Sequence, residues 1–319
     1  MTRGNPTQRV STRFEDWVER RTRRQRAHLR EGVPDYAFSL DMSIRRQMES
    51  LGPLRALAQS INAGTVPIQR ALHEVNGVAT SPTQLPNVHG IGVACAERLG
   101  IGVPQIFIVQ NPILNAFTYA TNDVDQVIVL TSGLVGALDE DELRFVIGHE
   151  CGHIHNRHVV YNTLWEILTN VLAQQVLVRS LSFLGPVGWL ATAVFTLGTR
   201  LVFGRWHRCA EFTCDRAGLI CATDPDAGDR VNAKLNMGSV GDLEGFNAGE
   251  YERQTKTYTN SWLRFTELLE SHPPGPRRAH AIRLFKDSDV FRSWRPDLDV
   301  ERPPRPLAEV DAEIEKIFL

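Results

Sequence analysis

The sequence predicts an α+β protein that is mainly helical, with a small antiparallel sheet beside a bundle of helices. Three observations carry this prediction. Apolar residues recur at helical spacing along much of the chain, two short β-branched runs lie between Pro104 and Leu130, and an amphipathic helix is expected after Asp139. The 319 residues suffice for one elaborated domain or two small ones.

The composition is that of an ordinary globular protein. Hydrophobic residues make up 42% of the chain, charged residues make up 23%, and the net charge is −2. These values exclude general disorder and bulk nucleic-acid binding, so no nucleic-acid partner is expected. The chain has 5 cysteines, with neither a CxxC pair nor the spacing of a disulfide scaffold, which favours reduced thiols and a cytoplasmic location. The polar start, which lacks an apolar core, is not typical of a secretory signal.

Residues 1–80 are predicted to form an N-terminal helical region. Apolar residues from Leu51 to Ile61 have helical spacing, with breaks expected at Gly52-Pro53 and at Gly64. The stretch from Arg20 to Arg30 is rich in arginine. A solvated first helix is favoured there over an arm that touches acidic lipid or a partner.

The sheet is predicted from two strands near the middle of the chain. A helix through Val93 and Leu99 leads to a strand at 104–109, and a second strand follows at 126–130. Residues 115–120 and a turn-like segment separate the two strands. A small antiparallel sheet is therefore expected just before the next helix.

That helix has both a start signal and an apolar face. Asp139 followed by Glu142 indicates a capping box, which satisfies backbone N–H groups at a helix start. Its apolar stripe contains Leu143, Ile147, Cys151 and Ile154. One side of the helix is therefore expected to face the core.

The opposite side of the helix carries His149-Glu150-Cys151-Gly152-His153. Residues four apart lie on one helical face, so His149 and His153 can direct their imidazoles at one metal ion. Glu150 lies about 100° around the helix, where its carboxylate can accept a proton from a water on that metal. The pattern indicates a zinc site rather than a solvated polar face.

A catalytic zinc site normally has three protein ligands. A third histidine on the same segment is excluded, because Asn156 and Val159 occupy the positions where HExxHxxGxxH has glycine and histidine. His155 and His158 point away from the metal face of the helix, so both are expected to be surface histidines.

A carboxylate from another helix is the remaining source of a ligand. Glu166 is roughly 20 Å away along a continuing helix and is excluded unless the chain turns back. Glu211 is the better candidate, with Asp215 one turn later as an acceptor for the other N–H of a ligand histidine. On the ExxxD spacing alone, a charged helix face with an Asp215/Arg216 surface pair would be the favoured interpretation.

The motifs in combination resemble the gluzincin family of zinc endopeptidases that includes HtpX and the CAAX prenyl proteases. The resemblance covers roughly residues 82–282. It rests on Thr131-Ser132-Gly133-Leu134, the acidic segment 139–143, the HExxH, Ala210-Glu211, Asp215-Arg216-Ala217-Gly218, Asn115-Ala116-Phe117, and Ser271-His272-Pro273 followed by Arg278.

The resemblance implies a role for each matching residue. It implies one Zn²⁺ per chain, with His149, His153 and Glu211 as ligands, Glu150 as the general base and Asp215 as a supporting residue. It further implies that substrate pairs with Asn115, Ala116 and Phe117, and that His272 and Arg278 lie near the cleft as catalytic or supporting residues. The N-terminal transmembrane helices of HtpX-like members have no counterpart here.

Beyond the zinc helix, residues 180–199 carry no charge but are interrupted by Gly185-Pro186. They are interpreted as one arm of a buried helical hairpin that ends near Phe203, with 165–178 as the other arm. Peripheral membrane contact through 180–203 or the Arg-rich start is left open. Residues 224–242 are expected to be a connector, and the apolar stripe from Leu307 to Ile317 is expected to dock on the rest of the protein.

The sequence therefore divides into 1–80 as the N-terminal helical region, 81–225 as the catalytic core and 226–319 as a C-terminal helical region packing on that core. The expected function is that of a zinc endopeptidase acting on extended or unfolded protein segments. Two alternatives remain: a membrane-associated processing protease, and a non-catalytic, zinc-stabilised interaction protein.

Overall fold

The computed structural model describes residues 28–30, 32–50, 52–120, 125–162, 165, 185–238, 243, 245–257, 273–298 and 303–318. Its strands are β1 (Leu29–Arg30), β2 (Val33–Pro34), β3 (Gly77–Ala79), β4 (Gln105–Val109), β5 (Ala116–Ala120) and β6 (Gln126–Thr131). Its helices up to the zinc motif are α2 (Ser39–Ser50), α3 (Gly52–Asn76), α4 (Pro86–Leu99), α5 (Ser132–Ala137) and α6 (Glu140–His155). The later helices are α9 (Gly185–Cys221), α10 (Ala227–Met237), α11 (Ala248–Thr257), α13 (Gly275–Lys286), α14 (Asp289–Trp294) and α15 (Leu307–Phe318).

The mainly helical α+β class is confirmed, with one refinement to the sheet. The four-stranded sheet has the order β3-β4-β6-β5, and its two outer pairings are antiparallel. The inner pair β4 and β6 runs parallel, with Ile106 opposite Ile128. After β4 the chain first forms β5 at the edge of the sheet, and it then returns to form β6 between β4 and β5. The sheet is therefore mixed, and β5 lies at its edge.

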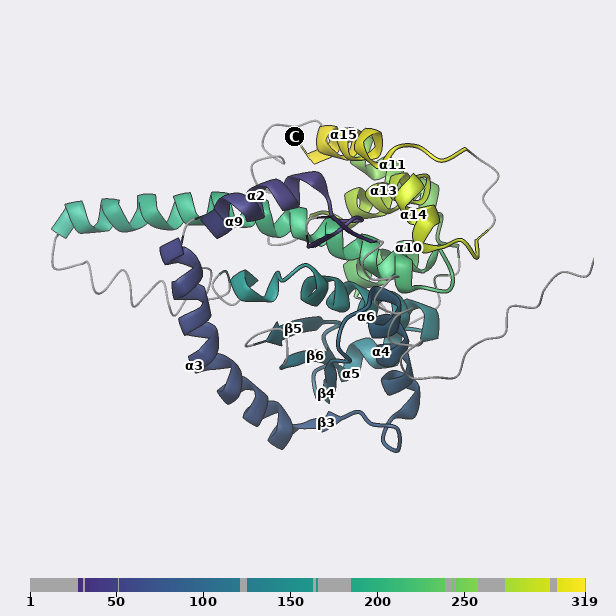
Figure 1. The fold of residues 1–319 in the computed structure, drawn as a ribbon, viewed down its shortest axis with the longest axis horizontal. Coiled ribbons are helices and arrows are strands. Elements are labelled where there is room, and N and C mark those ends of the chain that lie inside the picture. Colours follow the sequence, from purple (N-terminus) through teal and green to yellow (C-terminus); the bar gives the residue numbers. More distant parts are fainter. Residues whose placement is uncertain are drawn as a thin grey trace, which may run out of the picture.

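The two faces of the sheet are covered by different helices. Ile106 and Ile128 share a core cluster with residues of α4 and α6, whereas Phe107 and Val129 cluster with Val66 of α3. This division follows from the two-residue period of a strand, which directs successive side chains to opposite faces. Figure 1 shows α3 descending along one side of the sheet, and α6 between the sheet and α9.

Glycines allow α6 and α9 to cross at close range. A Cβ atom added at Gly148 would lie 2.5 Å from Cβ of Cys221, and one added at Gly152 would lie 2.7 Å from Cβ of Ala217. On the facing helix, a Cβ added at Gly218 would lie 2.7 Å from the carbonyl oxygen of Phe145. Only glycine permits this approach, which brings the side chains of α9 within reach of those on α6.

The expected hairpin arm that ends near Phe203 is wrong in its boundary. Helix α9 continues unbroken to Cys221, because its C-terminal half is anchored by packing on α6. The second arm, 165–178, and Glu166 lie outside the described residues apart from Trp165. Within the part of the chain that the structure describes, no helix has both the length and the apolar character that crossing a membrane requires.

Three other expectations can be compared with the structure. Gly64 does not interrupt α3, because glycine in an exposed helix costs only about 1 kcal/mol relative to alanine. The connector expected at 224–242 contains α10, which packs on α6. The docking of the C-terminal stripe is confirmed, since Val310 and Ile314 of α15 are fully buried.

The C-terminal helix is also held by a buried ion pair. Arg216 of α9 donates to Asp311 of α15 at 2.5 Å and to the backbone carbonyl of Tyr36 at 3.0 Å. Its guanidinium lies over the rings of Phe38 and Phe285. The surface pair considered for Asp215 and Arg216 is therefore wrong, because Arg216 joins four segments in the interior. The three-part domain division stays a prediction.

Candidate metal centre and active site

Helix α6 begins and faces its neighbours as its sequence predicts. Asp139 accepts a hydrogen bond from the backbone of Glu142, and the Glu142 carboxylate accepts one from the backbone of Asp139, which completes the capping box. The apolar stripe of α6 is buried in the core. His149, Glu150 and His153 are also buried, on the side of α6 that faces α9 and the cleft.

Helix α9 brings Glu211 to the two histidines. The carboxylate oxygens of Glu211 lie 3.6 Å from Nε2 of His149 and 3.4 Å from Nε2 of His153. Zinc bonds of about 2.0–2.2 Å in a tetrahedron place neighbouring donor atoms roughly 3.4 Å apart. Two imidazole nitrogens and one carboxylate at these separations therefore fit a shared Zn²⁺.

Asp215 orients the first of these histidines. Its carboxylate lies 3.0 Å from Nδ1 of His149, so Nδ1 carries the hydrogen and Nε2 keeps its lone pair toward Glu211. Arg278 from α13 donates to both oxygens of Asp215, at 2.5 and 2.8 Å, and lies 3.4 Å from Glu211. Burial would raise the pKa of Asp215, but Arg278, together with His149, holds it below its ordinary value.

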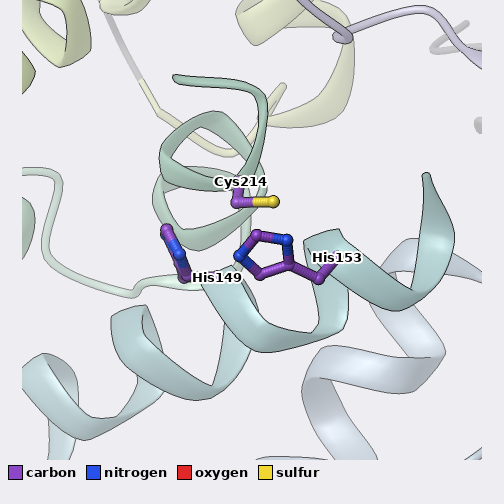
Figure 2. Close-up of side chains that lie close together, drawn as sticks. All are labelled: His149, His153 and Cys214. Atoms are coloured by element: carbon purple, nitrogen blue, oxygen red, sulfur yellow. The ribbon is translucent and has the colours of Figure 1, made fainter. Parts of the chain in front are cut away.

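Cys214 is a second potential donor beside the histidines. Its sulfur and one nitrogen from each of His149 and His153 all lie within 4.8 Å of one another. Figure 2 shows Cys214 reaching from α9 toward the ring of His153. The sulfur also lies 3.5 Å from Nδ1 of His158, and burial, with Glu211 close by, raises the pKa of the thiol. Glu211, which faces both Nε2 atoms, is the better third ligand.

His158 is not a surface residue, contrary to the expectation from the sequence, whereas His155 is half-buried. His158 is 0% exposed, with Nε2 3.0 Å from a carboxylate oxygen of Asp41 and Nδ1 3.2 Å from Nδ1 of His153. His155 lies 3.0 Å from the hydroxyl of Tyr36. The α6 helix ends at His155, so the following turn redirects His158 in a way that helical periodicity does not describe.

The candidate metal centre lies between two cavities. A cavity of about 600 Å³ extends from His149, Glu150 and His153 toward α3, and one of about 250 Å³ extends toward α10 and α13. Glu150 and Glu211 line both cavities. The Glu150 carboxylate is therefore accessible from both cavities.

The edge strand β5 forms a wall of this cleft. Asn115 and Ala116 line both cavities, and Phe117 lines the larger one. Thr131 holds the start of this strand, because its hydroxyl donates to the carbonyl of Ile113 at 2.6 Å and accepts from the backbone of Asn115 at 3.1 Å. Gly133 allows the backbone of Pro112 to approach α5 closely, since a Cβ added at Gly133 would lie 2.2 Å from the carbonyl oxygen of Pro112.

Comparison with known proteins identifies the family. A family model described as peptidase family M48 matches residues 82–285, which is more than half of the chain. The chain belongs to peptidase family M48. This membership confirms the family resemblance that its motifs indicate.

Several M48-like relatives match over long stretches. The chain is 33% identical over 230 residues to the plastoglobule-localized metallopeptidase 48 of Arabidopsis thaliana, covering 68% of this chain and 61% of that protein. It is 26% identical over 167 residues to a protease HtpX homolog of Ralstonia nicotianae, covering 49% and 58% of the two chains. A Pyrococcus abyssi HtpX homolog is 26% identical over 226 residues, or 65% and 76%. The chain thus spans less than two thirds of the length of the plant and Ralstonia proteins.

Among solved structures, the chain is similar to Ste24p of S. mikatae. The TM-score is 0.46 and the sequence identity 16%, over 75% of this chain and 58% of that chain.

Other residues of this M48 site were missed by the sequence analysis. The larger cavity is also lined by His73 of α3, which lies 2.8 Å from the Tyr119 hydroxyl, and by Trp165, whose ring stacks on that of His207. His207 precedes Glu211 by one helical turn, which is the only signal that could have indicated it. His272 lies outside the described residues. Arg278 lies beside the site, and its contacts there are with Asp215, Glu211 and Nδ1 of His149.

Proposed function

We propose that this chain is a zinc-dependent endopeptidase that cleaves extended or unfolded protein segments. The observation that carries the proposal is the convergence of His149, His153 and Glu211 beside Glu150, at the junction of two cavities. Membership of peptidase family M48 supports the same chemistry. The ligands would be the three converging residues, with one Zn²⁺ per chain.

When bound, Zn²⁺ acts as a Lewis acid, which polarises a carbonyl and lowers the pKa of a water molecule toward about 7. Proton transfer is carried out by a residue of the chain. Glu150 accepts the proton of the attacking water and passes it to the leaving amine as the peptide bond breaks. Its position on the ligand helix, one residue after His149, keeps the carboxylate beside the metal rather than on it.

Arg278 serves this site as a positioning residue in the proposal. Its guanidinium bridges Asp215 and Glu211, so it holds the carboxylate that orients His149 and the carboxylate that would bind zinc. Two buried carboxylates this close to each other need such a cation while no metal is bound.

The edge of β5 is the proposed substrate-binding wall. It is the last strand of the sheet order, and Asn115, which directly precedes it, lines the cleft together with its residues Ala116 and Phe117. An extended segment could add to this edge as a further strand, with main-chain hydrogen bonds that place little demand on sequence. This mode favours unfolded or extended substrates over folded ones.

The test is zinc content and casein cleavage, measured on wild type, Glu150→Gln and Glu140→Gln in parallel. Glu140 is an exposed residue of the same helix, paired with Arg144. About one zinc in all three proteins, with cleavage lost only in Glu150→Gln, is the expected result. Zinc binding with equal cleavage in all three would exclude Glu150 as the base. Zinc without cleavage in wild type would support the zinc-stabilised interaction protein, and no zinc would overturn the site.

We further propose a cytoplasmic location for this activity. The five cysteines are buried and free, as expected for a reducing compartment. Cell fractionation followed by a carbonate wash separates this proposal from the membrane-associated processing protease, because a membrane-embedded protein would stay in the pellet.

A further inference from the structure

We propose that Asp41 and His158 form a relay that fixes the tautomer of His153 and so prepares this histidine to bind the metal. The inference rests on the zinc site proposed above and adds two positioning residues to it. Neither residue belongs to the HExxH or to the Glu211–Asp215 motif, and Asp41 lies on α2, far from α6 in the sequence.

The relay is a continuous chain of short polar contacts. A carboxylate oxygen of Asp41 lies 3.0 Å from Nε2 of His158, and Nδ1 of His158 lies 3.2 Å from Nδ1 of His153. On the opposite side of its ring, Nε2 of His153 faces Glu211 at 3.4 Å. The His153 ring therefore stands between the relay and the proposed zinc position.

The direction of each hydrogen bond follows from the donors available. The same oxygen of Asp41 already accepts a hydrogen bond from the hydroxyl of Thr213 at 2.7 Å, as an ionised carboxylate does. Nε2 of His158 must then donate, which leaves Nδ1 of a neutral His158 as an acceptor. The groups beside that acceptor are Nδ1 of His153 at 3.2 Å and the Cys214 thiol at 3.5 Å. Both can donate to it, and donation from Nδ1 of His153 leaves the lone pair of His153 on Nε2, where a metal ligand needs it.

The opposite tautomer would disable the ligand. If Nδ1 of His158 carried the hydrogen, Nδ1 of His153 would accept it and Nε2 of His153 would carry a hydrogen toward Glu211. A protonated Nε2 cannot bind a metal ion. The orientation of the whole relay therefore depends on the carboxylate at its far end.

The surroundings hold the relay rigidly. Asp41 and His158 are 1% and 0% exposed, and the ring of His158 meets that of Trp206 edge to face at 5.7 Å between centroids. The Thr213 hydroxyl that donates to Asp41 itself accepts from the backbone N–H of Phe38 at 3.1 Å. Burial therefore shields the contact between Asp41 and His158 from competition by water.

The two histidine ligands are thus oriented by different devices. Asp215 contacts His149 directly, whereas Asp41 acts on His153 through a second imidazole. This arrangement makes the N-terminal helix α2 part of the metal centre. Partners of this kind typically change metal affinity by about 10–100-fold when they are removed.

The experiment measures zinc affinity of metal-free protein by competition with a chelator, together with the visible absorption of the cobalt-loaded protein. The variants are His158→Leu, which removes the relay, and His158→Gln, whose amide can donate to Asp41 and accept from His153. His155→Leu is the matched control, because His155 is a neighbouring histidine that contacts Tyr36.

We expect His158→Leu to weaken zinc binding by about 10–100-fold and to alter the cobalt spectrum, with His158→Gln recovering most of the affinity. His155→Leu should keep wild-type zinc affinity. A purely structural role for His158 would instead lower the thermal stability of the metal-free protein without changing the cobalt spectrum.

Wild-type zinc affinity in His158→Leu, or equal weakening in His158→Leu and His158→Gln, would overturn the relay. If His158→Leu does not fold, Asp41→Asn decides the question, because it removes the ionised acceptor at nearly constant volume. Reduced zinc affinity in that variant supports the relay and unchanged affinity overturns it. Failure of wild type itself to bind zinc would instead overturn the proposed function.

Discussion

At the scale of single residues, the most demanding feature of the site is the proximity of Glu211 and Asp215. Both carboxylates are buried, one helical turn apart on α9, and both point at the histidines of α6. Arg278 is the cation that contacts both. Burial would lower the pKa of Arg278, but the two carboxylates raise it, so the guanidinium stays charged.

We predict that Arg278→Met destabilises the metal-free protein by about 3–5 kcal/mol, because two buried carboxylates lose their cation. Urea unfolding with and without a chelator measures this loss, which should be smaller with zinc bound. Arg144→Met, at a surface pair with Glu140, is the control and should cost about 0–1 kcal/mol. Similar losses of unfolding free energy in both variants would show that Arg278 contributes no more to stability than a surface ion pair does.

At the scale of elements, the close crossing of α6 and α9 determines whether Glu211 reaches the histidines. The proposed ligands lie on two helices, so a shift of one helix changes the separations between their donor atoms directly. Gly148 and Gly152 lie on the same helix as the histidines, and each is in contact with α9. The glycines of the motif region therefore have a packing role that the spacing of the ligands alone does not reveal.

We predict that Gly148→Ala lowers stability by about 1–3 kcal/mol and weakens zinc binding, because the added methyl would push Cys221 and α9 away. Gly90→Ala is the matched control in α4, where a Cβ meets nothing within 4 Å. It should stabilise the protein by roughly 0.5–1 kcal/mol. Thermal unfolding and chelator competition give both readouts, and unchanged zinc affinity in Gly148→Ala would contradict the argument.

At the scale of the whole molecule, residues beside the metal centre also connect distant segments. Arg216 follows Asp215 directly, yet its guanidinium points the other way, toward Asp311 of α15 and the carbonyl of Tyr36. Neighbouring residues of α9 therefore contact the proposed metal centre and attach the C-terminal helix.

We predict that Asp311→Ala destabilises the protein by about 3–5 kcal/mol, because the buried Arg216 is left without its carboxylate. The zinc affinity of the folded fraction should stay close to that of wild type. Urea unfolding and zinc titration separate the two effects. Asp287→Ala, at a different carboxylate of the C-terminal half, provides a comparison, and an equal loss there would contradict the assignment.

A pH dependence is expected from Tyr119, whose partner His73 lines the larger cavity. Burial raises the pKa of Tyr119 to about 12, and its hydroxyl lies 2.8 Å from Nδ1 of His73. Since the folded-state pKa exceeds the ordinary value of about 10, the contribution of this phenol is present below pH 10 and is lost as the pH rises toward 12.

We therefore predict that Tyr119→Phe is less stable than wild type at about pH 8, by roughly 1 kcal/mol, and that the difference shrinks by about pH 11. Urea unfolding of both proteins at several pH values measures the difference in their free energies of unfolding. A difference that stays constant over this range would show that the hydroxyl titrates as it does in the unfolded chain.

The sequence by itself determined the local geometry of the site. The capping box at Asp139, the apolar stripe of α6 and the four-residue spacings of His149 with His153 and of Glu211 with Asp215 all follow from helical periodicity. That periodicity is a property of neighbouring residues, so it can be read without knowledge of the fold.

Only the tertiary structure decided which distant groups meet. The parallel pairing of β4 with β6, the burial of His158 against Asp41 and the role of Arg278 at two carboxylates depend on how helices and strands pack. Helical spacing says which side chains share a face of one element, but not which face of another element lies opposite. That choice is made by the burial of apolar surface over the whole chain, with glycines at the closest crossings.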